Sequence, residues 1–137
     1  MTTLLPSGWP RPKGYAAGVS AEGRLVFVSG QIGWDAAGSF VSSELAAQVE
    51  QALRNVVAIL HEAGAGPQDI VRLTWYVTDK RTYLAKQTAV GAAYRNVLGR
   101  HFPAMSVVEV SALVEDAALV EIEATAVIPT VPEQLAP

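Results

Sequence analysis

The side chains that could perform chemistry in this sequence are few and scattered. Glu121 and Glu123 are two residues apart, so both carboxylates would project from one face of a strand. Two carboxylates can act as general acid and base, but a solvated or subunit-paired strand face explains the same pattern. His61 and His101 are expected at a helix end and in a loop, where a histidine needs no catalytic role.

Several kinds of site are excluded by residue type or spacing. The chain has no cysteine, which excludes disulfides, thiolate zinc sites and a cysteine nucleophile. No His-x-x-x-His spacing occurs, and residues 30–33 (GQIG) lack the glycine spacing and the lysine of a phosphate-binding loop. Ser29 has no G-x-S-x-G turn around it, so a serine triad is not expected. We therefore expect neither a metal nor another cofactor.

Length and composition are typical of one globular domain without a nucleic-acid or membrane partner. Of the 137 residues, 50% are hydrophobic and 17% are charged, which suffices for a sizeable core. Ten basic and 13 acidic side chains give a net charge of −3, and no basic patch stands out. No apolar run approaches the roughly 18 residues of a membrane-spanning helix, and the N-terminus does not resemble a signal peptide. A soluble cytoplasmic protein is expected.

The N-terminal half predicts an arm, a hairpin and a helix. Prolines and glycines prevent a helix over residues 1–14 and indicate a loop or arm. Residues 15–19 and 25–33 flank a turn and indicate a β-hairpin. Apolar residues at helical spacing predict a helix over 43–63.

The C-terminal half predicts a strand, a helix and two further strands. Residues 70–78 alternate between an apolar face and a mixed face. Asp79 can cap a second helix, which Gly99 would end. Strands follow at 106–112 and at 119–128, the second with strict alternation.

Together these elements predict an α+β fold in a single domain over 1–137, with a flexible tail at 129–137. Two helices can cover only one face of a sheet this wide. The other face is too apolar to be exposed to water and too polar to form a hydrophobic core within one subunit. We therefore expect it to be an oligomer interface. Its polar members are Arg72, Thr74, Tyr76, Glu121 and Glu123. Trp34 and Trp75 are interpreted as core or interface aromatics, with a ligand-lining role left open.

Four segments resemble the Rid family, also called the YjgF-like or L-PSP endoribonuclease-like family. They are residues 28–32 (VSGQI), 69–79 (DIVRLTWYVTD), 102–110 (FPAMSVVEV) and 120–127 (VEIEATAV). The resemblance extends over about residues 14–128 in one order. It implies a chorismate-mutase-like subunit, with a mixed sheet and two helices on one face. It also implies a homotrimer whose sheets line a central barrel, with small-molecule clefts between subunits.

The resemblance also implies an activity and a set of site residues. Family members hydrolyse enamines and imines, such as 2-aminoacrylate and 2-iminopropanoate, to 2-keto acids and ammonia. By resemblance, Glu121 matches the glutamate that positions the hydrolytic water. Tyr15 and Ser29 match residues of the cleft, and Gly30 matches the small residue that leaves room for the ligand.

Two positions depart from the family pattern. The family arginine that binds the substrate carboxylate is replaced by Met105, and Val107 stands where a cysteine is common. A thioether carries no charge and donates no hydrogen bond, so weak hydrolysis of standard 2-imino acids is expected. Arg72 or Arg11 could supply a substitute charge.

Three functions stay open at this point. The first is a Rid-like hydrolase or deaminase for an enamine, an imine or a related small molecule that lacks the usual carboxylate contact. The second is a non-catalytic small-molecule-binding or regulatory trimer. The third, a ribonuclease or translation inhibitor as in the older family names, is the weakest because the net charge is −3.

Overall fold

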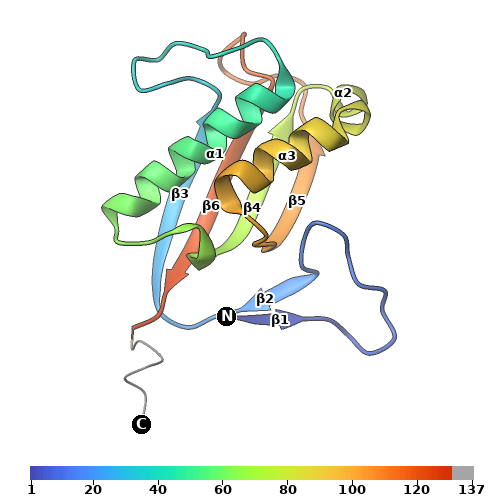
Figure 1. Ribbon diagram of the computed structural model, residues 1–137, viewed down its shortest axis with the longest axis vertical. Coiled ribbons are helices and arrows are strands. Elements are labelled where there is room, and N and C mark those ends of the chain that lie inside the picture. Colours follow the sequence, from blue (N-terminus) through green and yellow to red (C-terminus); the bar gives the residue numbers. More distant parts are fainter. Residues whose placement is uncertain (131–137) are drawn as a thin grey trace.

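A mixed four-stranded sheet in the order β3-β6-β4-β5 forms one layer of the molecule (Figure 1). The computed structural model describes residues 1–130, so the predicted tail at 129–137 lies almost wholly outside the described residues. Strands β3 and β4 run antiparallel to β6, and β5 runs parallel to β4. Their bounds are β3 (Arg24–Ile32), β6 (Val120–Ile128), β4 (Ile70–Val77) and β5 (Ala104–Glu109).

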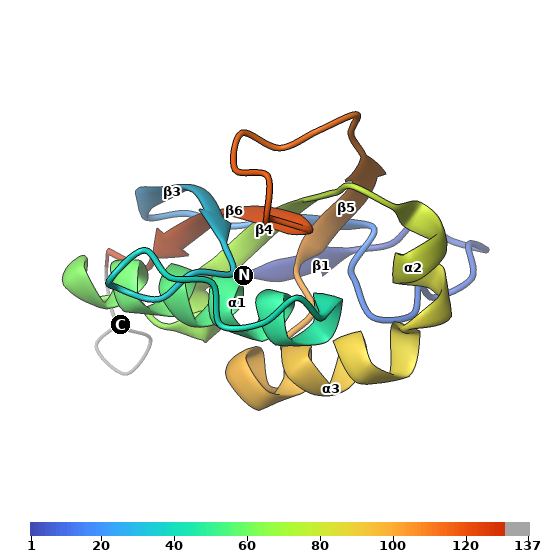
Figure 2. The same cartoon turned by 90° about the horizontal axis from the view of Figure 1, so that it is seen from above.

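The helices form the second layer, on one face of the sheet. Figure 2 shows α1 (Leu45–Glu62) and α3 (Gln87–Leu98) on the same side of the strands. Helix α1 has a fully buried apolar stripe that includes Val49 and Val56, as its helical spacing predicts. The predicted α+β fold is confirmed. Within residues 1–130, no helix is both long enough and apolar enough to span a bilayer.

The second predicted helix is divided in two. Asp79 caps α2 (Lys80–Ala85) by accepting hydrogen bonds from the backbone N–H groups of Arg81 and Thr82. Lys86 has a non-helical backbone (φ −111°, ψ 23°) and separates α2 from α3. Gly99, at φ 66°, ends α3 as predicted.

The predicted N-terminal hairpin is wrong in its pairing. Strand β2 (Gly18–Ser20) pairs antiparallel with β1 (Thr2–Leu4) in a separate two-stranded sheet, and β3 pairs with β6. The β1 segment precedes Pro6, so its N–H groups are free to pair, while the rest of the arm is irregular.

The faces of β4 and β6 alternate as predicted. Leu73 and Trp75 on β4 and Ile122 on β6 are buried under the helices. On the opposite, open face Phe27 is 73% exposed. Strand β5 starts at Ala104 rather than 106, because Ala104 is already in register with Arg72 of β4.

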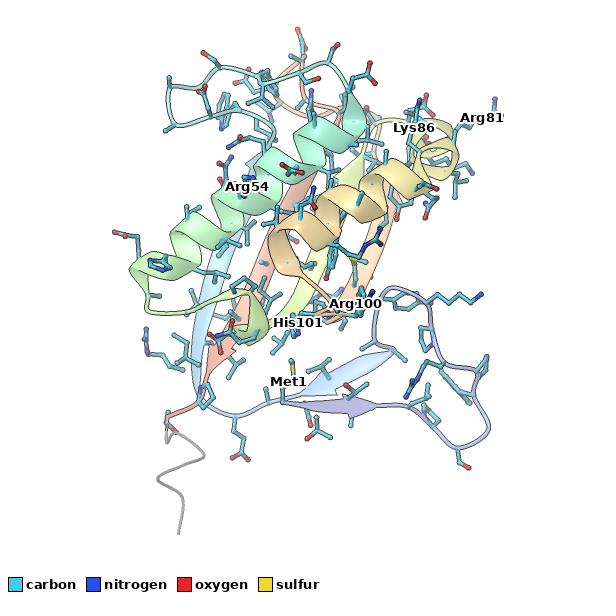
Figure 3. The ribbon with its side chains drawn as sticks, in the orientation of Figure 1. Met1, Arg54, Arg81, Lys86, Arg100 and His101 are labelled. Atoms are coloured by element: carbon cyan, nitrogen blue, oxygen red, sulfur yellow. The ribbon has the colours of Figure 1, made fainter. Side chains whose placement is uncertain are left out.

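His101 has a structural role just beyond α3, where Figure 3 places it. Its Nε2 lies 2.7 Å from the carbonyl oxygen of Ile70, and its own carbonyl accepts a hydrogen bond from the Tyr94 hydroxyl. These contacts connect the end of α3 to the start of β4 and give His101 a structural role.

Candidate functional site

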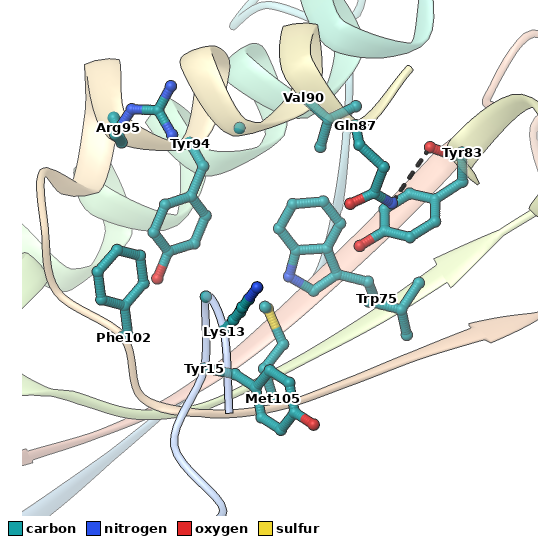
Figure 4. Close-up of a pocket in the computed structure, with 13 residues that line it drawn as sticks. Lys13, Tyr15, Trp75, Tyr83, Gln87, Val90, Tyr94, Arg95, Phe102 and Met105 are labelled. Carbon is teal, nitrogen blue, oxygen red and sulfur yellow. Dashed lines mark hydrogen bonds between the residues drawn. The ribbon is translucent and has the colours of Figure 1, made fainter. Parts of the chain in front are cut away.

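A cavity of about 510 Å³ lies between β5, α3 and the N-terminal arm (Figure 4). Its volume is in the range of small-molecule sites. Tyr15, Met105 and Val107, three of the predicted site residues, line it together. No carboxylate is among its lining residues.

The arm reaches this cavity through a short contact with β5. Ala16 forms a parallel bridge with Ala104, and its N–H donates to the carbonyl of Pro103 at 3.0 Å. This contact fixes Tyr15 beside the start of β5. Met105 is paired with the buried Leu73 of β4, so its side chain lies on the helix-facing side of the sheet.

One wall of the cavity is a row of aromatic rings. The Trp75 ring lies 6.4 Å from those of both Tyr83 and Tyr94, measured between centroids. Tyr94 stacks on Phe102 at 5.9 Å. Burial raises the pKa of the Tyr94 phenol, so this hydroxyl stays protonated and keeps its bond to His101. The wall is therefore apolar and well ordered by packing.

No sequence pattern identifies the charged side chains of this cavity as site residues. Lys13 in the arm and Arg95 in α3 both line it, and neither was singled out from the sequence. The position of Lys13 depends on the long-range bridge between the arm and β5, which no local pattern reveals. Trp75, whose ligand-lining role was left open, lies both in the core and at the cavity.

Glu121 and Gly30 meet on the open face, away from this cavity. The register of β3 and β6 shifts between Val28 and Gln31, and Gly30 lies in that irregularity. A Cβ atom at Gly30 would come within 2.5 Å of the Glu121 carboxyl carbon. Any side chain at position 30 would therefore push the Glu121 carboxyl group out of its present place.

The two glutamates on β6 differ in their partners. The Tyr76 hydroxyl donates to Glu123 Oε1 at 2.7 Å, and this hydrogen bond to the carboxylate raises the pKa of Tyr76. Among residues 1–130 no hydrogen bond uses the Glu121 carboxylate. Glu121 is thus the carboxylate that is free to bind a water or a ligand.

Ser29 lies in a hollow of about 450 Å³ on the open face, together with Arg72, Thr74 and Glu123. Arg11 lines another hollow, which it shares with Tyr15 and His101. Neither arginine suggested as a substitute charge lines the cavity of Met105.

The predicted site residues therefore form two groups on opposite sides of one sheet. Tyr15, Met105 and Val107 line the cavity beside β5, whereas Ser29, Gly30 and Glu121 lie on or beside the open face. The cavity beside β5 contains none of the second group, and the hollow around Ser29 contains none of the first.

A family model described as Endoribonuclease L-PSP matches residues 10–128. The chain belongs to this family. A 2-iminobutanoate/2-iminopropanoate deaminase of Salmonella typhimurium is 40% identical over 116 residues, covering 82% of this chain and 86% of the relative. A RutC family protein of Pyrococcus abyssi is 37% identical over 118 residues, covering 85% of this chain and 89% of the relative.

Solved structures agree with the assignment to this family, also known as Rid. The Rid family protein YyfB of Yersinia pestis has a TM-score of 0.77 and 34% identity, covering 93% of this chain and 98% of that one. The YjgF gene product of E. coli has a TM-score of 0.66 and 36% identity, with the same coverage. The predicted family and its α+β subunit are confirmed.

Proposed function

We propose that this Rid protein hydrolyses a reactive imine or enamine to a carbonyl compound and ammonia. The observation that carries the proposal is the Glu121 carboxylate, which lies against Gly30 and has no hydrogen-bond partner among residues 1–130. The neighbouring Glu123 carboxylate, in contrast, already accepts a hydrogen bond from Tyr76. Relatives at about 40% identity that are named as 2-imino acid deaminases support the reaction class.

Glu121 would act on the attacking water. It accepts a proton as the water oxygen bonds to the imine carbon, and it returns the proton to the nitrogen. The product of this step is a carbinolamine, whose hydroxyl proton Glu121 then transfers to the amino nitrogen. The carbon–nitrogen bond breaks, ammonia leaves, and the carbon keeps the water oxygen as its carbonyl. The net reaction consumes one imine and one water. Tyr15 and Ser29 orient the ligand in this proposal.

The site is completed by a second copy of the chain. Tyr15 and Met105 lie on the other side of the sheet from Glu121, so one subunit alone does not bring them to one ligand. A homotrimer in which the β5 cavity of one subunit meets the open face of another would unite the two groups. The partners are thus a small molecule and further copies of this chain.

Met105 favours a second candidate, a small-molecule-binding trimer that has lost the chemistry. No guanidinium lines the cavity from β5, where the family arginine would stand. Ribonuclease activity, which the family description suggests, is disfavoured by the net charge of −3.

The test is a pair of matched substitutions on β6. Glu121→Gln removes the free carboxylate, and general acid–base catalysis contributes about 10²- to 10⁴-fold, so hydrolysis should fall at least about 100-fold. Glu123→Gln keeps an amide oxygen that can accept from Tyr76, and it should retain most of the activity. Imines generated in situ by an amino-acid oxidase serve as substrates, and ammonia release is followed.

Equal loss in both variants would show that Glu121 has no special role. If the wild type accelerates the hydrolysis of no imine or enamine while still binding small molecules, the binding-protein candidate replaces the hydrolase.

A further inference from the structure

The cavity beside β5 contains a buried hydrogen-bond donor without a partner. Trp75 is 2% exposed, and its Nε1–H is buried and makes no hydrogen bond within residues 1–130. Figure 4 shows the nitrogen edge of the indole turned into the cavity, towards the side of Lys13 and Met105. An indole N–H can only donate, and buried donors are almost always paired. An occupant of this cavity should therefore present an acceptor to Trp75.

The charges around the cavity indicate that this acceptor is anionic. Lys13 and Arg95 line the cavity, and no acidic side chain does. The only salt bridge among residues 1–130 joins Arg54 to Glu50, so neither of the two cations is paired. A Cβ atom at Gly91 would lie 3.2 Å from Arg95 Nη1, which shows that the guanidinium folds across the bare backbone of α3.

The aromatic wall indicates the rest of the ligand. Rings of Tyr83, Trp75, Tyr94 and Phe102 follow one another along it. Met105 adds a polarizable thioether, which favours contact with aromatic rings. A ring in the ligand would gain both burial and edge or stacking contacts here.

We infer that this cavity selects 2-imino acids with an aromatic side chain, whose carboxylate is held by Trp75 Nε1, Lys13 and Arg95. The inference rests on the proposed function for the reaction, and it names the substrate class. The positive charge in this cavity comes from Lys13 of the arm and Arg95 of α3, and not from strand β5 (Figure 4). A molecule as small as 2-iminopropanoate cannot fill about 510 Å³, whereas an aromatic relative fills much more of it.

The first experiment measures binding in the full-length wild type. The probes are phenylpyruvate, pyruvate and the neutral methyl ester of phenylpyruvate, added to protein with ¹⁵N-labelled tryptophan. Phenylpyruvate should bind at least about tenfold more tightly than either analogue, because it alone offers both the ring and the charge. It should also move the Trp75 indole N–H resonance downfield. Trp9 and Trp34 lie outside the cavity lining and serve as internal references.

Matched variants then test the two cations. Lys13→Met and Arg95→Gln should each weaken phenylpyruvate binding several-fold and leave binding of the ester unchanged. The controls are Lys80→Met and Arg100→Gln, which remove exposed cations that do not line the cavity. Trp75→Phe assigns the indole signal where it folds, and the wild-type titration does not depend on it.

Two results would overturn the inference: equal binding of all three probes, or an unmoved Trp75 resonance at saturation. Its failure is distinguishable from that of the proposed function. Hydrolysis of 2-iminopropanoate and of the phenylalanine-derived imine at equal rates, with no Trp75 response, removes the inference alone. Tight phenylpyruvate binding without hydrolysis of either imine removes the proposed function alone.

Discussion

At the residue scale, we expect position 105 to determine whether a small carboxylate is bound. Met105→Arg should raise the hydrolysis of 2-iminopropanoate, because a guanidinium binds a carboxylate with two charge-assisted hydrogen bonds. Such bonds contribute about 1.5–3 kcal/mol, so a gain of roughly tenfold or more in kcat/KM is expected over a weak wild type. The new charge would share the cavity with Lys13 and Arg95, so the melting temperature should fall.

The control for this substitution is Met105→Leu, which keeps an apolar side chain of similar volume and should gain nothing. A folded Met105→Arg variant that hydrolyses no 2-imino acid faster than the wild type would show that the cleft has diverged beyond this one residue.

Gly30 should matter for activity because it adjoins the Glu121 carboxyl group. Gly30→Ala places a methyl group against the Glu121 carboxyl group, and no left-handed φ at Gly30 adds backbone strain. We expect a loss of at least about tenfold in kcat, in the range of an acid–base group moved from its position, with a folded protein. Gly18→Ala is the control, because the nearest atom to its Cβ is a Leu4 carbon at 3.4 Å. Unchanged turnover in Gly30→Ala would contradict a role for the Glu121 position.

At the element scale, one buried side chain ties α1 to the loop before β6. The Gln48 amide donates to the carbonyls of Ser42 and Ala117, each at 2.9 Å, and accepts from the Leu119 N–H at 2.8 Å. Gln48→Leu leaves these groups without partners. We expect the free energy of unfolding to fall by at least about 2 kcal/mol, measured by urea denaturation.

Gln51→Leu is the matched control on the same helix. Among residues 1–130 its side-chain amide bonds only to Asn55, one turn away, so the expected loss is below about 0.5 kcal/mol. If Gln48→Leu unfolds at the same urea concentration as the wild type, the apolar gain offsets the lost hydrogen bonds.

The elements that the sequence predicted well are those with a strong period. Residues 119–128 alternate strictly and form β6, and the apolar stripe of 43–63 forms α1. The prediction of the hairpin was wrong because the three residues of β2 carry no pattern that distinguishes β1 from β3 as the pairing strand. Of the cavity lining, the sequence singled out Tyr15, Met105 and Val107 but not Lys13. Lys13 is brought there by the long-range bridge between Ala16 and Ala104, which no local pattern reveals.

At the scale of the whole molecule, the open face of the sheet exposes large apolar side chains that no other element of residues 1–130 covers. Leu25 and Phe27 on β3 are 58% and 73% exposed, and they lie on the strand that carries Ser29 and Gly30. A large apolar ring left in water on a flat sheet face is unfavourable, and burial against another copy would remove that cost.

This face predicts self-association, the family resemblance implies that the assembly is a trimer, and we expect activity to depend on it. Light scattering at micromolar concentration should give three times the 14.5 kDa chain mass. Phe27→Lys places a charge on the open face and should yield folded monomers or a strongly weakened trimer. Those monomers should have lost hydrolysis, because Glu121 and the Met105 cavity lie on different sides of one subunit. Ile59→Lys, at a position of α1 that is 39% exposed, should stay trimeric and active. A monomeric wild type, or active Phe27→Lys monomers, would mean that one subunit suffices for the chemistry.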